Sequence, residues 1–249
     1  MFESLYILPF VGVFVGFISG FFGIGGGAIL VPVLLAFGYD IKSAIADATM
    51  LMLTAAIFGS YFNYKRAKYE LRGAIILGLG AAFGSLFSGF IVEAVPELAL
   101  KITLACVIAF NFYRLLRINI HENTGDVNIP EIWLFIIGAV IAAFAISIGM
   151  GGAVFLTPLL VGVLGVDIKK AISLGLFFVF FFCFGGFVSM SYNGLIDYKI
   201  GAILSVGGLV GVYFGTLAHH KIEKHKQKLA LMGLNIITFS LVIRSIFLS

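Results

Sequence analysis

Long apolar runs separated by short charged segments dominate the chain. They form ten pieces: 5–22, 28–38, 43–62, 72–92, 98–116, 131–148, 153–165, 170–191, 199–218 and 226–247. Eight pieces have about the length of a membrane-spanning helix, which needs about 20 apolar residues. The second and seventh pieces are only about half a bilayer long at about 1.5 Å per residue. The pattern predicts an all-α polytopic membrane protein with about eight transmembrane helices, or eight to ten segments when half-helices are counted.

Composition supports this class. Hydrophobic residues make up 61% of the chain and charged residues 11%, whereas soluble domains are about 45–50% apolar and about 25% charged. A soluble enzyme and a disordered chain are therefore excluded. The net charge of +4 does not indicate nucleic acid, because Lys and Arg lie between the apolar runs as topology signals. The apolar start, with Glu3 in place of a basic region, predicts a first membrane segment and no signal peptide.

A polar segment, INIHENTGDVNIP at 118–130, separates the first five apolar pieces from the last five. Its Asn, Gly, Asp and Pro residues are typical of an exposed connection. We predict one integral membrane domain with a first repeat at 1–117, a polar linker at 118–130 and a second repeat at 131–249.

The two halves share short sequence blocks at nearly constant spacing. GIGG at 23–26, followed by Pro32, matches GMGG at 149–152, followed by Pro158. The tripeptide Asp-Ile-Lys then recurs in each half, at 40–42 and at 167–169. Shared composition alone can produce scattered Gly and Leu matches, but it does not readily produce ordered blocks at nearly constant spacing. We therefore interpret the halves as an internal repeat.

The distribution of basic residues predicts how the repeats are oriented. If each short piece completes one crossing with the segment before it, the sixteen basic residues divide evenly across the membrane. If each short piece turns back as a re-entrant hairpin, one side keeps only Lys42, Lys101, Lys199 and Arg244. The other side then holds the basic loops 63–72, 114–130 and 219–228, which the positive-inside rule makes cytoplasmic. This second topology places the two repeats in opposite orientations, a recurring design of secondary transporters.

The two glycine-rich breaks are the predicted binding site. Glycine permits positive φ and lets a membrane helix break, and unwound backbone survives there only where protein or water satisfies its amides. The short helices that begin near Ala28 and Ala153 would then point free N–H groups and a positive dipole end into the membrane, which suits an anion. The predicted substrate-binding residues are Gly25, Gly26, Gly27, Ala28, Pro32, Gly151, Gly152, Ala153 and Pro158. The alternative is that these glycines only allow tight helix packing.

Few other residues suggest chemistry. Asp47 is an acid inside an apolar run, where ionisable groups suggest function, and we consider a proton-coupling role for it. The alternative is a carboxylate that reaches interfacial water. We interpret His219, His220 and His225 as part of an ordinary charged loop, and we predict no metal site, no cofactor and no catalytic residue. A G-x-G-x-x-A match at 23–28 lacks the βαβ context of a dinucleotide site.

The blocks GFFGIGGGAILVPVLLAFGYDIKSAIADA at 20–48 and SIGMGGAVFLTPLLVGVLGVDIKKAIS at 147–173 resemble the sulfite exporter TauE/SafE family, also known as the toluenesulfonate uptake permease group. The resemblance covers nearly the whole chain. It implies a polytopic transporter of sulfur-containing anions such as sulfite or sulfonates. The family's Gly-Gly-Gly-Pro region maps onto Gly25, Gly26, Gly27 and Pro32, and its second copy has Ala153 in place of the third glycine.

We therefore expect a secondary transporter of small, sulfur-containing anions in a prokaryotic inner membrane, working by alternating access at the two breaks. It is not expected to be an enzyme. Its expected partners are the anion, the lipid bilayer and a coupling proton or ion, with no nucleic acid. A channel for an anion or a small solute and a non-transporting membrane scaffold stay open as alternatives. The sequence does not indicate the oligomeric state, the direction of transport or the coupling ion.

Overall fold

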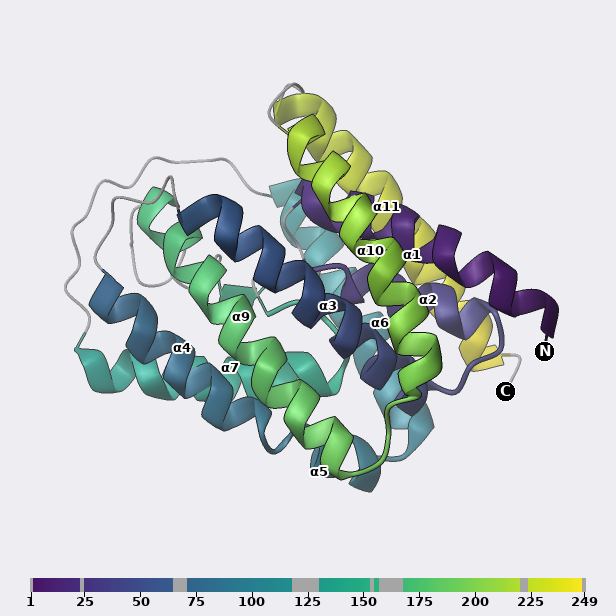
Figure 1. Ribbon diagram of the computed structural model, residues 1–249, viewed down its shortest axis with the longest axis horizontal. Helices are drawn as coiled ribbons and strands as arrows, with labels where there is room; N and C mark the ends of the chain where they lie inside the picture. The colour runs from purple at the N-terminus through teal and green to yellow at the C-terminus, as the bar shows by residue number, and fades with distance from the viewer. Residues whose placement is uncertain are drawn as a thin grey trace.

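The computed structural model describes residues 2–22, 25–64, 71–117, 130–152, 155–156, 168–219 and 224–247, and within these ranges it is helical without a strand (Figure 1). The helices are α1 (Phe2–Phe22), α2 (Gly27–Ala36), α3 (Ile41–Tyr64), α4 (Leu71–Ser85), α5 (Ser88–Ala94), α6 (Glu97–Arg117), α7 (Glu131–Ser147), α9 (Ile168–Tyr192), α10 (Tyr198–His219) and α11 (Lys224–Phe247).

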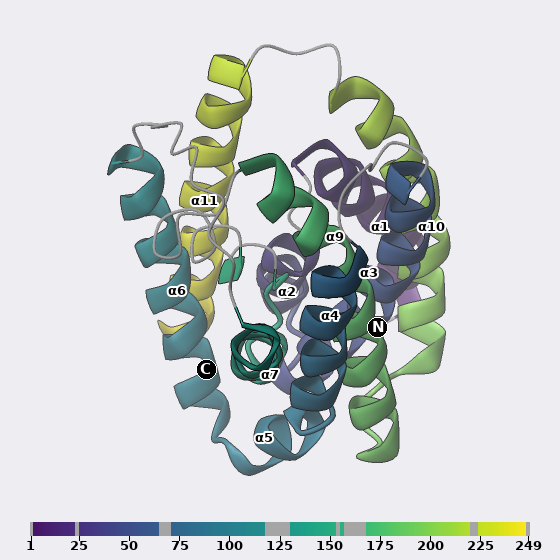
Figure 2. The ribbon, with the colours of Figure 1, turned by 90° about the vertical axis from the view of Figure 1, so that its left-hand side faces the viewer.

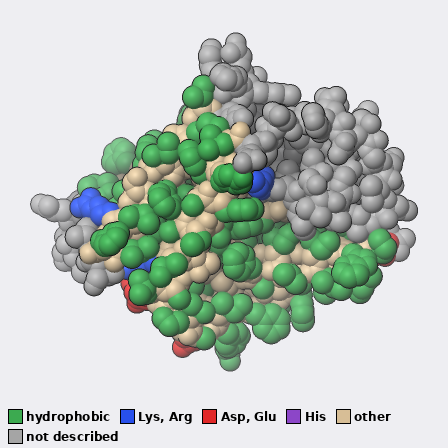
Figure 3. Space-filling model, turned by 180° about the vertical axis from the view of Figure 1, so that it is seen from behind, with side chains coloured by type: hydrophobic (Ala, Val, Ile, Leu, Met, Phe, Trp, Pro, Cys, Tyr) green, Lys and Arg blue, Asp and Glu red, His purple; other side chains and the backbone are tan. Residues whose placement is uncertain are grey.

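Several helices are long and apolar enough to cross a membrane. Four stretches meet this condition within the described residues: Ile41–Phe58 in α3, Ile75–Ala94 across α4 and α5, Tyr198–Ala218 in α10 and Leu229–Phe247 in α11. Large hydrophobic side chains also cover much of the outer surface, where Figure 3 shows few charged groups among the described residues. An apolar exterior of this kind requires lipid around it, because a soluble monomer rarely exposes large apolar patches. The prediction of about eight spans stays a prediction.

Glycine contacts join α1 to α10 over most of their length. A Cβ atom added to Gly12, Gly16 or Gly20 would collide with the backbone carbonyl oxygen of Leu204, Gly208 or Val212, respectively. Because both sets of numbers rise together, α1 and α10 run in the same direction. The absence of side chains lets the two backbones approach closely, as small residues do between membrane helices.

The pair α4 and α7 packs in the same way. Added Cβ atoms on Gly80 and Gly84 would collide with the carbonyl oxygens of Phe135 and Ala139, so these two helices are also parallel. The helix α9 lies beside α4, with Gly185 against Ala82. The three helices α4, α7 and α9 form one group in Figure 1, whereas α1 and α10 lie in another part of the molecule.

The helix α3 joins the two groups. Its first turns lie against the start of α10, where the backbone N–H of Asp197 donates a hydrogen bond to Asp47 Oδ1 at 3.0 Å. Lys42 Nζ donates to the carbonyl oxygen of Glu93 in α5 at 2.7 Å. We call this end of the molecule, where α3, α6 and α10 begin and α9 finishes, the α5 end. Since α9 reaches this end at its last residue, α3 and α9 are antiparallel.

The helices α6 and α11 form a flank that Figure 2 shows side by side. Lys101 Nζ donates to the carbonyl oxygen of Ser245 at 3.4 Å, which joins the start of α6 to the last turn of α11. Lys101 is therefore more than a topology signal. It lies in the second turn of α6 with 7% of its surface exposed, where the negative end of the α11 dipole stabilises its positive charge.

The pattern of the apolar piece 72–92 suggests one helix, but the structure divides it into two. The helix α4 ends at Ser85 and α5 begins at Ser88. Ser189 of α9 bridges the turn between them, because its Oγ accepts from the Gly89 N–H at 2.9 Å and donates to the Leu86 carbonyl oxygen at 2.5 Å. A side chain from a distant helix therefore satisfies the backbone groups that this interruption releases.

Candidate functional site

The first glycine-rich break lies between α1 and α2. Gly25 has φ 81° and Gly26 has φ 73°, a region that residues with a Cβ rarely occupy. The Gly27 N–H donates to the Gly25 carbonyl oxygen at 2.9 Å, which closes a tight turn around Gly26. Gly26 is the N-cap of α2, and no side chain caps this helix. The local sequence therefore stops one helix and starts another within a few residues.

The second break follows α7. Gly149 has φ 70°, its N–H donates to the Ile146 carbonyl oxygen at 2.9 Å, and the Met150 N–H donates to that of Ala145 at 2.9 Å. This pair of bonds is the Schellman motif that ends helices at a glycine.

Helical bonding resumes directly after this second break. The Gly152 carbonyl oxygen accepts from the N–H groups of Phe155 at 3.1 Å and Leu156 at 3.0 Å. At the first break, the Gly26 carbonyl oxygen accepts from Ile29 at 3.1 Å and Leu30 at 2.9 Å. Gly26 and Gly152, which match in the sequence comparison of the halves, therefore occupy the same position at the start of a helical turn.

The two breaks contact each other inside the molecule. A Cβ added to Gly25 would lie 3.2 Å from the Cα of Gly151, and a Cβ added to Gly27 would collide with the carbonyl oxygen of Gly149. Backbone therefore packs against backbone, and glycine is required on both sides. Segments that are more than 120 residues apart in the sequence form one continuous structure here.

Side chains from the three helices α1, α3 and α9 lie against the breaks. Near Gly26 lie Ser19 Cβ, 3.2 Å from an added Cβ, and Leu51 Cδ2, at 3.3 Å. Met52 Sδ lies 2.7 Å from an added Cβ on Gly27, and the Phe178 ring lies against Gly152. Leu51 and Phe178 each stand ten residues after the first residue of their helix, α3 or α9.

The structure brings together most of the predicted binding residues. Gly25, Gly26, Gly27, Gly151 and Gly152 all lie in or beside this contact. Ala28 follows in the first turn of α2, partly buried, and Pro32 is buried in the middle of α2. Ala153 and Pro158 lie outside the described residues.

The surroundings of the breaks are apolar. The helix α2 has no acidic residue in its first turn and no basic residue in its last turn. Among the described residues, no group of His, Cys, Asp and Glu side chains could hold a metal ion. The available polar groups are thus backbone amides and carbonyls, together with the Ser19 hydroxyl.

Sequence reasoning did not identify Ser19, Leu51, Met52 and Phe178 as neighbours of the breaks. Leu51, Met52 and Phe178 belong to ordinary apolar runs, and nothing in their local pattern distinguishes them. The repeat alignment could have found one relation, since Leu51 and Phe178 occupy matching positions after the two Asp-Ile-Lys blocks.

Asp47 lies on α3, one helical turn before Leu51. Its side chain is fully buried, and Oδ1 accepts the hydrogen bond from Asp197. Its other oxygen, Oδ2, is buried without a hydrogen-bond partner. The alternative of a carboxylate in contact with interfacial water is therefore not what the structure describes.

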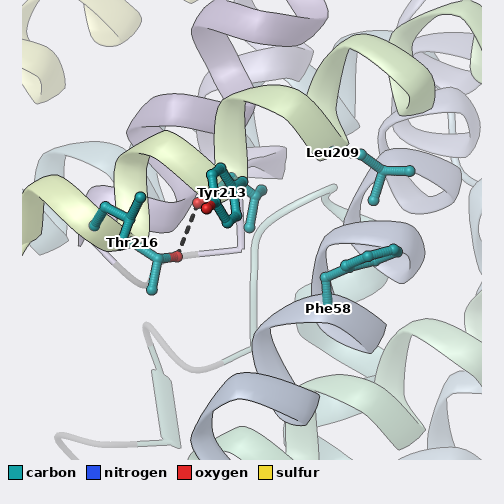
Figure 4. Close-up of a pocket in the computed structure, with 6 residues that line it drawn as sticks. Phe58, Leu209, Tyr213 and Thr216 are labelled. Atoms are coloured by element: carbon teal, nitrogen blue, oxygen red, sulfur yellow. Dashed lines mark hydrogen bonds between the residues drawn. The ribbon is translucent and has the colours of Figure 1, made fainter.

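A separate apolar pocket lies between α3 and α10 (Figure 4). It is lined by Phe58 of α3 and by Leu209, Val212, Tyr213, Thr216 and Leu217 of α10. The Thr216 hydroxyl donates to the carbonyl oxygen of Val212 at 2.8 Å, so it is satisfied within its own helix. None of the predicted binding residues lines this pocket.

Comparison with known proteins identifies the class of the chain. The model of the sulfite exporter TauE/SafE family matches residues 8–241. The probable membrane transporter protein YdhB of Bacillus subtilis is 24% identical over 206 residues, covering 80% of this chain and 84% of the relative. A probable membrane transporter protein of Methanocaldococcus jannaschii is 23% identical over 253 residues, covering 94% of each chain.

A third relative, from Haemophilus influenzae and also named a probable membrane transporter protein, is 25% identical over 235 residues and covers 87% of each chain. No solved structure matches the chain. The family model covers nearly the whole sequence, and each of the three relatives aligns with at least 80% of this chain. The chain is a membrane transporter and belongs to the sulfite exporter TauE/SafE family.

Proposed function

We propose that this chain is a secondary transporter of small sulfur-containing anions, such as sulfite or a sulfonate, and that the two glycine-rich breaks form its binding site. The observation that carries this proposal is the contact between the breaks, in which Gly25 and Gly27 meet Gly149 and Gly151. The description of the matching family as sulfite exporters supports the substrate class.

The chemistry of the breaks suits an anion. The helix α2 begins at Gly27 without a side-chain cap, so no side chain covers its positive dipole end. In this conformation the N–H groups of Gly27 and Ile29 donate to the carbonyl oxygens of Gly25 and Gly26, which a ligand would replace as acceptors. A second helical turn begins after Gly152, close to the first. Two such ends can stabilise an oxyanion without a buried Lys or Arg. Glycine leaves the amides open to the ligand, because no Cβ covers them.

Binding requires the breaks to separate, because they are packed backbone to backbone in this conformation. We infer that the halves are inverted repeats and that separation occurs when one moves against the other. Two parallel pairs support the inference: α1 with α10, and α7 with α4. Each pair joins the first helix of one half to a later helix of the other half. Repeats of inverted orientation are a recurring design of transporters with alternating access.

Thermal stability of the purified protein tests the binding site. We expect sulfite, thiosulfate or a sulfonate to raise the midpoint of unfolding, and sulfate, acetate and chloride at equal ionic strength to raise it less. A ligand at a hundred times its Kd adds about 2.7 kcal/mol to the stability of the folded state.

Two alanine variants separate the site from backbone strain. Gly26 and Gly38 both have positive φ, at 73° and 85°, but an added Cβ on Gly38 has no neighbour within 4 Å. We expect G26A to lose the response to the anion and G38A to keep it. An equal response of both variants to the anion would place the binding site elsewhere.

A further inference from the structure

The buried acid Asp47 has an incomplete set of partners. Oδ1 accepts the Asp197 N–H at 3.0 Å, whereas Oδ2 is buried without a hydrogen-bond partner. The side chain is fully buried. An ionised carboxylate is costly to bury unless it is fully hydrogen-bonded or paired. A carboxylic acid with its proton on Oδ2 fits this environment better.

Two further acids lie at this end of the molecule. Asp40 directly precedes α3, and Asp197 directly precedes α10 and donates its backbone N–H to Asp47. Lys42 is engaged by the Glu93 carbonyl oxygen in α5, and Lys199 is exposed in the first turn of α10.

The α9 side of this region is uncharged. There Met190 Sδ lies 3.4 Å from Thr49 Oγ1, and Thr49 is fully buried. The charged groups around Asp47 are therefore two acids, a lysine that already donates to a carbonyl oxygen, and an exposed lysine.

The position of Asp47 relates it to the breaks. Leu51, which lies against Gly26, follows Asp47 by four residues and so shares its face of α3. Four residues correspond to about 6 Å along the helix axis. On the other side, Asp47 contacts the exposed segment at Asp197. The carboxyl group therefore lies between the surface of the α5 end and the breaks.

We propose that Asp47 is the proton-binding site that couples proton entry to anion transport, an inference that rests on the proposed function. A negative charge on Asp47 would repel an anion at the start of α2, and protonation of Oδ2 removes that repulsion. Since coupling between two ligands is reciprocal, a bound anion also favours the proton. Proton and anion then cross together, and the proton leaves when water reaches Oδ2.

Infrared spectroscopy tests proton binding without any need for transport. The wild type should show the C=O stretch of a protonated carboxyl group, and this band should disappear as the pH rises. The band should be absent from D47N and present in D40N. Asp40 is a matched control because it is an exposed acid on the same segment, where its Oδ2 accepts the Ser43 N–H at 2.8 Å. A wild-type spectrum without a band that depends on Asp47 would overturn the proposal.

Anions then test the coupling. Methanesulfonate and thiosulfate, which stay ionised throughout the pH range, should move the loss of the band to higher pH in the wild type and in D40N. A band that neither anion moves would refute coupling, even though proton binding itself had been observed.

Flux in liposomes completes the test. With a gradient of one pH unit, wild type and D40N should accumulate methanesulfonate up to about tenfold on the alkaline side, if one proton accompanies each anion. D47N should still exchange labelled for unlabelled methanesulfonate but lose the accumulation. Accumulation by D47N equal to that of the wild type overturns the proposal. If the wild type carries none of the sulfur anions, the proposed function fails, and the infrared experiment still decides whether Asp47 binds a proton.

Discussion

At the scale of single residues, positive φ values are the feature that a substitution tests most directly. Gly38 follows the end of α2 with φ 85° and open space around it. G38A should therefore lose only about 1 kcal/mol of stability, the cost of placing a residue with a Cβ in the left-handed region. G26A should lose about 1 kcal/mol more, because the added Cβ meets Ser19 at 3.2 Å and Leu51 at 3.3 Å. Unfolding in mixed detergent micelles measures both. Equal losses would mean that the neighbours of Gly26 yield without cost.

Ser189 offers a second residue-scale prediction. Its hydroxyl holds both sides of the turn between α4 and α5, so S189A should destabilise the protein by about 1–3 kcal/mol, because it leaves the buried Gly89 N–H and the Leu86 carbonyl oxygen without this partner. The matched control is S240A, whose exposed hydroxyl donates only to the Ile236 carbonyl oxygen of its own helix and whose loss should be small. A loss in S189A no larger than in S240A would contradict a structural role for this bridge.

The sequence predicts these residues unequally. The glycines of the breaks are recognisable because they cluster and recur with a following proline. Ser189 and Asp197 are not, because their functions depend on contacts with residues at least 100 positions away. A single serine or aspartate in an apolar chain carries no local signal of such a contact. Asp47 is intermediate, since its position in an apolar run suggests function but not its partner.

At the scale of whole helices, close backbone approach should govern the pairing of α1 with α10. An added Cβ on Gly16 would lie 2.7 Å from the Cα of Gly208. G16A should therefore force the helices apart and destabilise the protein by about 2 kcal/mol. The control is G233A on α11, where an added Cβ has no neighbour within 4 Å; it should be neutral or stabilising by up to about 1 kcal/mol. Stability changes of the same sign and size in both variants would show that helix propensity, not packing, determines the effect of G16A.

Apolar periodicity locates helices well but not their interruptions or partners. The piece 170–191 agrees closely with α9 at Ile168–Tyr192, and 28–38 agrees with α2 at Gly27–Ala36. The piece 72–92 hides the end of α4, because the turn at Leu86 and Phe87 is as apolar as the helices around it. The pairings of α1 with α10 and of α4 with α7 depend on which glycines face one another, and one sequence alone does not fix that.

At the scale of the whole molecule, loop charge is the one sequence signal that addressed orientation. It favours short pieces that turn back over pieces that complete a crossing. The basic loops 63–72, 114–130 and 219–228 lie largely outside the described residues, so their placement in the cytoplasm stays a prediction. The described helices bear on the same question independently of charge, because α1, α3 and α10 run parallel. Since α1 and α3 both start from the same end, α2 must return the chain to that end between them.

The side of the membrane on which each end lies can be measured with single cysteines. After replacement of Cys106 and Cys183 by serine, cysteines introduced at Glu3, Asp40 and Glu97 should react with an impermeant thiol reagent from the same side. A cysteine introduced at Asp126, in the linker, should react only from the other side. If α1 and α2 instead formed one crossing, Glu3 and Asp40 would react from opposite sides. Opposite labelling of this pair would reject the re-entrant hairpin and, with it, opposite orientations for the two halves.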